Sequence, residues 1–380
     1  MLKAPTYDDI LLAAENIREK TIESPLVKLN WKTNDDVNIY LKLENLQEIG
    51  SFKVRAAGNA VTSLRRKHKD LSKIGVVTAS AGNFGQGLAW YCREYEIPCT
   101  CVVPSSAPKI KIEGMKRLGA KIIYVPYSKW WEIIETHQCE DVAPKSGIFV
   151  HPGAENSVLA GNATIALEII DSLPNVDCIL APYGSGALVT GIACGTRAIL
   201  REKNMDENKI RVVACEPDTA SPFALSMRNG KPTKFEKYQA SFVDGCGGKA
   251  VLPKVWNLAR DNIDQGVAVP LQKIKDAICI LLERNHIVAE GAGACTVAAA
   301  LSSKNLGKNI VCVVSGGGLD TNLLIDFLQD SSVLKNTKKK GSSVISNQKS
   351  TSRRSGFIIA AAASFLAASA VAVYYSWYMK

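Results

Sequence analysis

The chain has 380 residues, with 46 lysine and arginine residues against 36 acidic ones and a formal net charge of +10. This length is enough for two domains, because globular domains usually hold roughly 100–200 residues. Residues 331–380 hold eight basic residues and no acidic one, so the rest of the chain is nearly neutral and we expect no binding of nucleic acid. The 11 cysteines are scattered without a CxxC pair, as is typical of reduced thiols in a core.

Strand-like and helix-like segments alternate along the chain. Residues 40–44 alternate apolar and charged side chains, as a half-buried strand does, and residues 52–68 carry apolar side chains three and four positions apart, as a helix does. The other helix candidates are residues 83–95 and 188–200, and the other strand candidates are residues 74–77, 99–103, 121–125, 148–150, 178–181, 210–215 and 310–314. This alternation predicts an α/β fold with mainly parallel sheets.

Lys53 lies where the first strand gives way to the first helix, in the sequence Ser51-Phe52-Lys53-Val54-Arg55. We interpret Ser51 as the N-cap of this helix, which places Lys53 in the first turn. The positive end of the helix dipole opposes a lysine charge there and lowers the pKa of the amine, as a nucleophile for a carbonyl group requires. An ordinary solvated lysine is the alternative interpretation.

Two loops each follow a strand candidate and open a helix candidate. The loop Ser80-Ala81-Gly82-Asn83 would place backbone N–H groups and a helix start at the carboxyl end of a strand, which suits a carboxylate. In the second loop, residues 182–188, glycines let the backbone wrap around a phosphate, although neither a P-loop lysine nor the GxGxxG pattern is present. Ordinary turns are the alternative for both loops.

A third glycine-rich segment, Ser315-Gly316-Gly317-Gly318, follows the strand candidate at residues 310–314. Ser315 is the first polar residue at the carboxyl end of that strand, and the three glycines would let a flat molecule approach. The serine hydroxyl could then hydrogen-bond a nitrogen atom of a heteroaromatic ring.

These four elements, in this order, resemble those of the fold-type II pyridoxal-phosphate enzymes, and the chain is similar to the serine/threonine dehydratase and serine racemase family over about residues 7–329. Shorter stretches that match include residues 151–152, 216–217, 244–245 and 289–293. The resemblance implies two doubly wound α/β domains with mainly parallel sheets, as in the β subunit of tryptophan synthase. The large, cofactor-binding domain would hold residues 1–50 and 148–330, and the small domain residues 51–147.

The resemblance also implies roles for individual residues. Lys53 would bind the aldehyde of pyridoxal phosphate covalently and later remove the proton from the substrate α-carbon. Phe52 would pack on the cofactor ring, Asn83 would bond its hydroxyl group and Ser315 would face its nitrogen. The cofactor phosphate would be held by Gly184, Ser185, Gly186, Ala187 and Leu188, and the substrate carboxylate by Ser80, Ala81, Gly82 and Asn83.

The reaction that the resemblance implies is elimination from an L-β-hydroxy amino acid such as L-threonine or L-serine, which gives a 2-oxo acid and ammonia. A neutral Ser315 makes the cofactor ring a weaker electron sink than a carboxylate would, which suits the loss of a β-hydroxyl group. A racemase or a β-replacement synthase of the same fold is one alternative, and a catalytically inactive membrane-bound scaffold is another. Racemases similar to this chain carry a serine directly before the Gly-Asn pair, where Ala81 has no proton to give.

A divalent cation is a further candidate ligand, because members of the family often bind one through a Glu-Pro segment. Here that segment offers Glu216 and the carbonyl group of Ala220, while Pro222 stands where the racemases carry a carboxylate. One carboxylate and carbonyl groups make a weak Mg²⁺ site, so we leave the binding of a metal open. Two other departures from the family, Phe84 for a histidine and Gly318 for an asparagine, bear on substrate specificity.

The C-terminal residues predict a membrane anchor. Residues 331–355 are polar and basic, which predicts a disordered linker. Residues 356–378 hold no charge and end in aromatic side chains, so they predict a transmembrane helix across a bilayer core of about 30 Å, with the catalytic domain in the cytosol. A soluble alanine-rich helix that packs on a partner is the alternative. The expected partners are therefore a membrane, an amino-acid substrate and a second copy of the chain in a homodimer.

Overall fold

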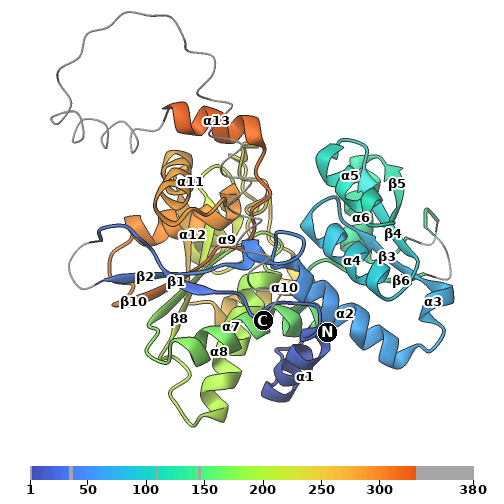
Figure 1. Cartoon of the computed structure of the whole chain (residues 1–380), viewed down its shortest axis with the longest axis horizontal. Helices are drawn as coiled ribbons and strands as arrows, with labels where there is room; N and C mark the ends of the chain where they lie inside the picture. Colours follow the sequence, from blue (N-terminus) through green and yellow to red (C-terminus); the bar gives the residue numbers. More distant parts are fainter. Residues whose placement is uncertain (1, 34–36, 108, 140, 144–146, 331–380) are drawn as a thin grey trace, which may run out of the picture. The chain divides into compact units, whose positions relative to one another are not determined.

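The computed structural model describes residues 2–33, 37–107, 109–139, 141–143 and 147–330, which belong to one compact unit (Figure 1). Within these residues the chain forms one six-stranded and one four-stranded sheet. Their strand pairs are parallel except for one pair at the edge of the larger sheet. This arrangement confirms the predicted α/β fold with mainly parallel sheets.

The larger sheet has the strand order β1-β2-β10-β7-β8-β9. Its strands are β1 (Leu26–Lys28), β2 (Asn38–Lys42), β10 (Asn309–Val313), β7 (Cys178–Pro182), β8 (Arg211–Pro217) and β9 (Gln265–Val269). The antiparallel pair is β1 with β2. Every residue of β7 is buried, as expected of a central parallel strand that is covered on both faces.

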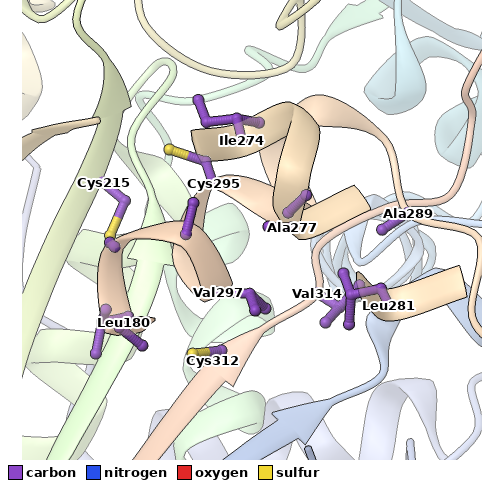
Figure 2. Close-up of a cluster of buried hydrophobic side chains, with 14 of the residues drawn as sticks. Leu180, Cys215, Ile274, Ala277, Leu281, Ala289, Cys295, Val297, Cys312 and Val314 are labelled. Carbon is purple, nitrogen blue, oxygen red and sulfur yellow. The ribbon is translucent and has the colours of Figure 1, made fainter. Parts of the chain in front are cut away.

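Helices cover both faces of this sheet. On one face, the core contains Leu180 of β7 and Cys215 of β8 together with side chains of α11 (Leu271–Asn285) and α12 (Gly291–Ser302) (Figure 2). The other face packs against α1 (Tyr7–Ile17), α7 (Asn156–Ser172), α8 (Ala187–Glu202) and α10 (Pro253–Asn262). The remaining helices along these parts of the chain are η1 (Glu44–Leu46), α9 (Pro222–Asn229) and α13 (Thr321–Asp330).

The smaller sheet has the strand order β5-β4-β3-β6. Its strands are β3 (Val76–Ala79), β4 (Cys99–Pro104), β5 (Lys121–Val125) and β6 (Ile148–Phe149). The helices of this part of the chain are α2 (Lys53–Lys67), α3 (Leu71–Ile74), α4 (Asn83–Glu94), α5 (Lys109–Arg117) and α6 (Tyr127–Thr136). Because α2 packs on both α4 and α7, it links the helices of the two sheets. The division into domains at residues 50 and 147 stays a prediction.

Most predicted strands lie where the sequence placed them. The bounds of β5 match the prediction, and those of β4, β7 and β10 differ by no more than one residue at either end. The strand predicted at residues 74–77 begins at Val76, because Ile74 ends α3 and Gly75 turns the chain with a φ of +76°, which glycine adopts without strain. All 11 cysteines are buried, as predicted.

No helix in the described part of the chain is long and apolar enough to cross a membrane. The longest of these helices, α7, has 17 residues, whereas a bilayer core needs about 20. This finding corrects the predicted fold class, which included a transmembrane helix, and the predicted membrane-anchored localisation. The segment 356–378 on which both predictions rested, and the linker 331–355, lie outside the described residues. Both predictions depended on an alanine-rich segment, and alanine is only marginally hydrophobic and also favours helices in water.

A buried cluster of charges joins the start of α2 to the larger sheet. The guanidinium group of Arg55 donates to both carboxylate oxygens of Glu44 at 2.8 Å and also to the carboxylate of Glu168. Lys42 of β2 donates to Glu168 and to the carbonyl oxygen of Ser24. Burial alone would lower the pKa of Arg55, but Glu44 and Glu168 outweigh it and raise that pKa. The cluster therefore sets two basic side chains against two acidic ones, and Arg55 keeps its charge.

We expect Arg55→Ala to destabilise the fold by about 3–5 kcal/mol, because it leaves the charges of Glu44 and Glu168 without their partner. The measurement is the free energy of unfolding from urea titration. Arg93→Ala is the matched control, since Arg93 pairs with Glu94 near the surface and the loss of such a pair costs at most about 1 kcal/mol. Equal stability of the two variants would show that the cluster does not hold the fold together.

Candidate active site

The predicted site residues lie at the carboxyl ends of parallel strands. Lys53 begins α2, residues 80–82 join β3 to α4, residues 183–186 join β7 to α8, and Ser315 follows β10. Ligands of open α/β sheets bind at this edge, because helix starts and the N–H groups of loops gather there. The arrangement is the one that a cofactor with a phosphate group needs.

Backbone contacts join the start of α2 to the end of β10. The N–H of Phe52 donates to the carbonyl oxygen of Ser315 at 3.0 Å. The neighbouring residue, Ser51, forms a β-bridge with Gly316. The structure thus brings the segments of Lys53 and Ser315 together, although they are far apart in the sequence.

The start of α2 differs from the prediction by one residue. Phe52, not Ser51, is the N-cap, and Lys53 is the first helical residue. The hydroxyl of Ser51 still accepts a hydrogen bond from the N–H of Lys53 at 3.4 Å. Serine is a favoured N-cap residue, but here its backbone is already engaged in the bridge to Gly316, which the local sequence does not reveal.

The amine of Lys53 lies in a half-buried, largely apolar setting. Its nitrogen is 4.8 Å from the ring centre of Phe52 and 5.8 Å from that of Phe84, and it has no hydrogen bond or ion pair within the described residues. Burial lowers the pKa of Lys53 to about 8, although the carboxylate of Glu290 acts in the opposite direction. The lowered pKa agrees with the prediction, but its main cause is burial rather than the helix dipole.

The loop before α4 is shaped for an anion. Its N-cap, Gly82, has no side chain to bind the N–H groups of Asn83 and Phe84, so within the described residues these two groups are available to a ligand. The hydroxyl of Ser80 accepts hydrogen bonds from the N–H of Gly82 at 3.4 Å and of Gly85 at 3.2 Å. Asn83 begins the helix, and its amide donates to both carboxylate oxygens of Glu290 at 3.4 Å.

The glycine loop before α8 is packed closely between other loops. Gly186 is the N-cap and has a φ of +87°, which other residues rarely adopt. A Cβ atom on Gly184 would lie 3.0 Å from the carbonyl oxygen of Gly245, and one on Gly153 would lie 2.8 Å from the hydroxyl oxygen of Ser185. The loop therefore holds one conformation at the start of a long helix, as a phosphate site requires.

Two buried polar side chains complete the site. Ser315 is 1% exposed, and within the described residues its hydroxyl has no hydrogen bond, so it is ready to meet a nitrogen acceptor. Glu290, to which the sequence analysis gave no role, is the N-cap of α12 and is 4% exposed. Its motif at residues 289–293 contributed to the resemblance, but nothing in that motif indicates where the carboxylate points.

Burial raises the pKa of Glu290 to about 7. The charge of Lys111 lowers this pKa and that of Asp244 raises it, while the amide of Asn83 and the charge of Lys53 lower it by smaller amounts. The site therefore contains an acid and an amine that both titrate near neutral pH.

The predicted metal ligands are already engaged in hydrogen bonds. The carboxylate of Glu216 accepts from the N–H of Phe223 at 3.1 Å and of Ala224 at 2.9 Å, at the start of α9. The carbonyl oxygen of Ala220 accepts from the N–H of Gly248 at 3.2 Å. The described residues contain no group of three or more His, Cys, Asp or Glu side chains that could hold a metal ion. These residues do not fit a divalent cation, and we derive no step through one.

A family model described as pyridoxal-phosphate dependent enzyme matches residues 17–316. The chain belongs to this family. An L-threonine ammonia-lyase of Thermotoga maritima is 36% identical to this pyridoxal-phosphate dependent enzyme over 300 residues, which cover 78% of the chain and 71% of the relative. A catabolic L-threonine dehydratase of Staphylococcus aureus is 33% identical over 321 residues, which cover 82% and 88%.

Among solved structures, the serine racemase of Dictyostelium discoideum has a TM-score of 0.71 at 29% identity and covers 84% of this enzyme and 100% of its own chain. The comparisons confirm three predictions: the likeness to fold-type II enzymes of the serine/threonine dehydratase family, the cofactor pyridoxal phosphate, and the class of pyridoxal-phosphate-dependent lyases. The roles of the individual site residues stay predictions.

The residues present fit this cofactor. The glycine loop offers a cradle that Cβ atoms would fill, and Ser315 is a buried polar residue at the end of β10. Residues 184–188 would hold the phosphate, Ser315 the ring nitrogen, Asn83 the ring hydroxyl and Lys53 the aldehyde. Once bound, the cofactor supplies a ring that accepts electron density from the substrate α-carbon.

We expect Lys53→Ala to abolish turnover and the visible absorption of the bound cofactor, at about 410–420 nm in such enzymes, while circular dichroism shows an intact fold. The reason is that the variant lacks the amine that bonds the aldehyde. Lys20→Ala is the matched control, because Lys20 pairs with Glu94 away from the site. Borohydride reduction that still attaches the cofactor to another lysine would contradict the assignment of Lys53.

Proposed function

We propose that this enzyme eliminates the β-hydroxyl group of L-threonine or L-serine and releases a 2-oxo acid and ammonia. The observation that carries the proposal is the half-buried amine of Lys53, with its lowered pKa, on a segment that is bonded to the segment of Ser315. The names of the two relatives, a threonine ammonia-lyase and a threonine dehydratase, support this substrate class.

In this proposal Lys53 is the base at the substrate α-carbon. Its lowered pKa gives a useful fraction of neutral amine near neutral pH, and a neutral amine can accept the proton. The rings of Phe52 and Phe84 lie beside the amine. The free N–H groups at the start of α4 would bind the carboxylate of the substrate, which orients its α-hydrogen toward Lys53.

A neutral hydroxyl at Ser315 favours elimination over reactions that keep negative charge at the α-carbon. Unlike a carboxylate, a serine does not hold a proton on the ring nitrogen, so the charge is stabilised less strongly. When the β-hydroxyl group leaves promptly, negative charge does not have to be held at the α-carbon. The chemistry therefore agrees with a substrate that carries a leaving group on its β-carbon.

Racemisation is the second candidate, because a serine racemase is among the similar solved structures. It needs a proton donor on the face opposite Lys53. The predicted position of that donor is Ala81, whose methyl group has no proton to give. The hydroxyl of the preceding residue, Ser80, accepts two N–H groups of its own loop, which favours a structural role for it.

We expect the wild-type enzyme to release 2-oxo acid from L-threonine or L-serine with little D-amino acid, because Ala81 cannot return a proton to the α-carbon. A panel of L-amino acids, followed by chiral chromatography, is the measurement. Ala81→Ser should raise racemisation measurably without abolishing elimination, and Ala81→Gly is the control that adds no hydroxyl. Formation of D-product as fast as 2-oxo acid in the wild type would favour the racemase instead.

Two expectations do not enter this proposal. The homodimer and the division into a domain of residues 1–50 and 148–330 and one of residues 51–147 stay predictions. All side chains named in the proposal come from one copy of the chain, so the reaction scheme does not depend on either. Light scattering of the purified enzyme would measure the number of copies.

A further inference from the structure

The carboxylate of Glu290 occupies a space that three glycines leave open. A Cβ atom would lie 2.6 Å from a carboxylate oxygen if placed on Gly316, 3.0 Å if placed on Gly245 and 3.4 Å if placed on Gly318. The first distance is too short for any side chain, so a larger residue at Gly316 would displace the carboxylate, and the second is tight enough that the carboxylate would have to shift by a few tenths of an ångström. These glycines come from two distant loops, and the space they leave fits an acid beside the predicted cofactor site.

Asn83 is the side chain that hydrogen-bonds this carboxylate within the described residues. Its amide nitrogen donates to both oxygens of Glu290, each at 3.4 Å. These bonds are long, so the carboxylate keeps acceptor capacity for a stronger donor. The two bonds still fix the direction of the Asn83 amide, and Asn83 is the residue that we expect to contact the cofactor ring.

The charges that face Glu290 come from three further segments. They are Lys111 of α5, Asp244 of the loop before α10 and Lys53 of α2. Lys111 and Asp244 form an ion pair with each other, and their effects on the pKa of Glu290 oppose each other. Lys53 has no ion-pair partner within the described residues. The remaining cation and the remaining anion of the site are therefore Lys53 and Glu290.

We propose that Glu290 is a positioning residue of this active site, which orients the amide of Asn83 and serves as the counter-charge of the Lys53 ammonium group before the cofactor binds. The proposal rests on the proposed function in one respect only, the identity of Lys53 as the residue that bonds the cofactor. In this proposal Glu290 acts through the side chains of Asn83 and Lys53 and not on the substrate.

The charge of Glu290 changes the pKa of Lys53 in a definite direction. An ionised Glu290 favours the charged form of Lys53 and raises its pKa above the value that burial alone would set. A neutral glutamine at residue 290 removes this effect, so the pKa of Lys53 falls further below about 8. The neutral amine, which is the form that attacks an aldehyde, is then available at lower pH.

The experiment follows the binding of pyridoxal phosphate to cofactor-free protein. The rate of the absorbance rise at about 410–420 nm is measured between pH 6 and pH 10, and its midpoint reports the Lys53 amine. We expect Glu290→Gln to move the midpoint down by about one pH unit, which raises the rate at pH 7 roughly five-fold. Glu290→Asp keeps the charge and should return the midpoint toward that of the wild type.

Glu94→Gln is the matched control, because it removes the same charge at a surface residue that pairs with Lys20. Its midpoint should equal that of the wild type. An unchanged midpoint in Glu290→Gln, or an equal shift in Glu290→Asp, would overturn the counter-charge. Loss of orientation at Asn83 should appear in both variants as a raised KM for the amino acid, and an unchanged KM in both would overturn that role. Failure of the wild type to bind pyridoxal phosphate would instead contradict the proposed function.

Discussion

Arg55 fixes the start of α2 through two carboxylates, Glu44 and Glu168, and the position of Lys53 depends on this contact. Arg55 follows Lys53 by two residues on the same helix, and its guanidinium group is buried against η1 and α7. Because a buried cation that loses its partners is costly, the first turn of α2 cannot move away from the larger sheet. The amine therefore stays beside the segment of Ser315, and the other parts of the site are arranged around it.

Helix starts determine the electrostatics of this site. The first residues of α4, α8 and α12 all lie there, and each start favours negative charge. Two of them have a glycine N-cap and would bind the carboxylate and the phosphate, while the third carries Glu290 as its own acid. Lys53 begins α2 and has no ion-pair partner within the described residues; burial lowers its pKa and the charge of Glu290 acts in the opposite direction.

Local sequence patterns predicted the features that depend on local chemistry. The glycine loop before α8 was predictable because glycine readily adopts a positive φ, as Gly186 does here. The strand and the helix around the loop follow from the spacing of apolar residues. The parallel sheets followed from the alternation of such segments. The short edge strand β1 was not predicted, because three residues hold too little of a pattern.

Contacts between distant residues account for what the sequence did not predict. Ser51 is not the N-cap because its backbone pairs with Gly316, and the direction of the Glu290 carboxylate depends on Gly245, Gly316 and Asn83. The membrane anchor was predicted from an uncharged run of suitable length with aromatic and basic residues at its borders, and the alanine-rich composition of that run is compatible with water as well as with lipid. Composition alone does not distinguish the two environments, because the difference between them depends on what the segment packs against.

The charge of Glu290 near Lys53 explains how a half-buried amine can act as a base here. An ammonium group without a partner would be expensive in this setting, and a fully neutral amine could not release a proton when the reaction ends. With pKa values of about 8 for the amine and about 7 for the acid, the two groups exchange a proton at little cost near neutral pH. Their titration belongs to the pair, so a proton that passes from one group to the other leaves no lone charge in the interior of the site.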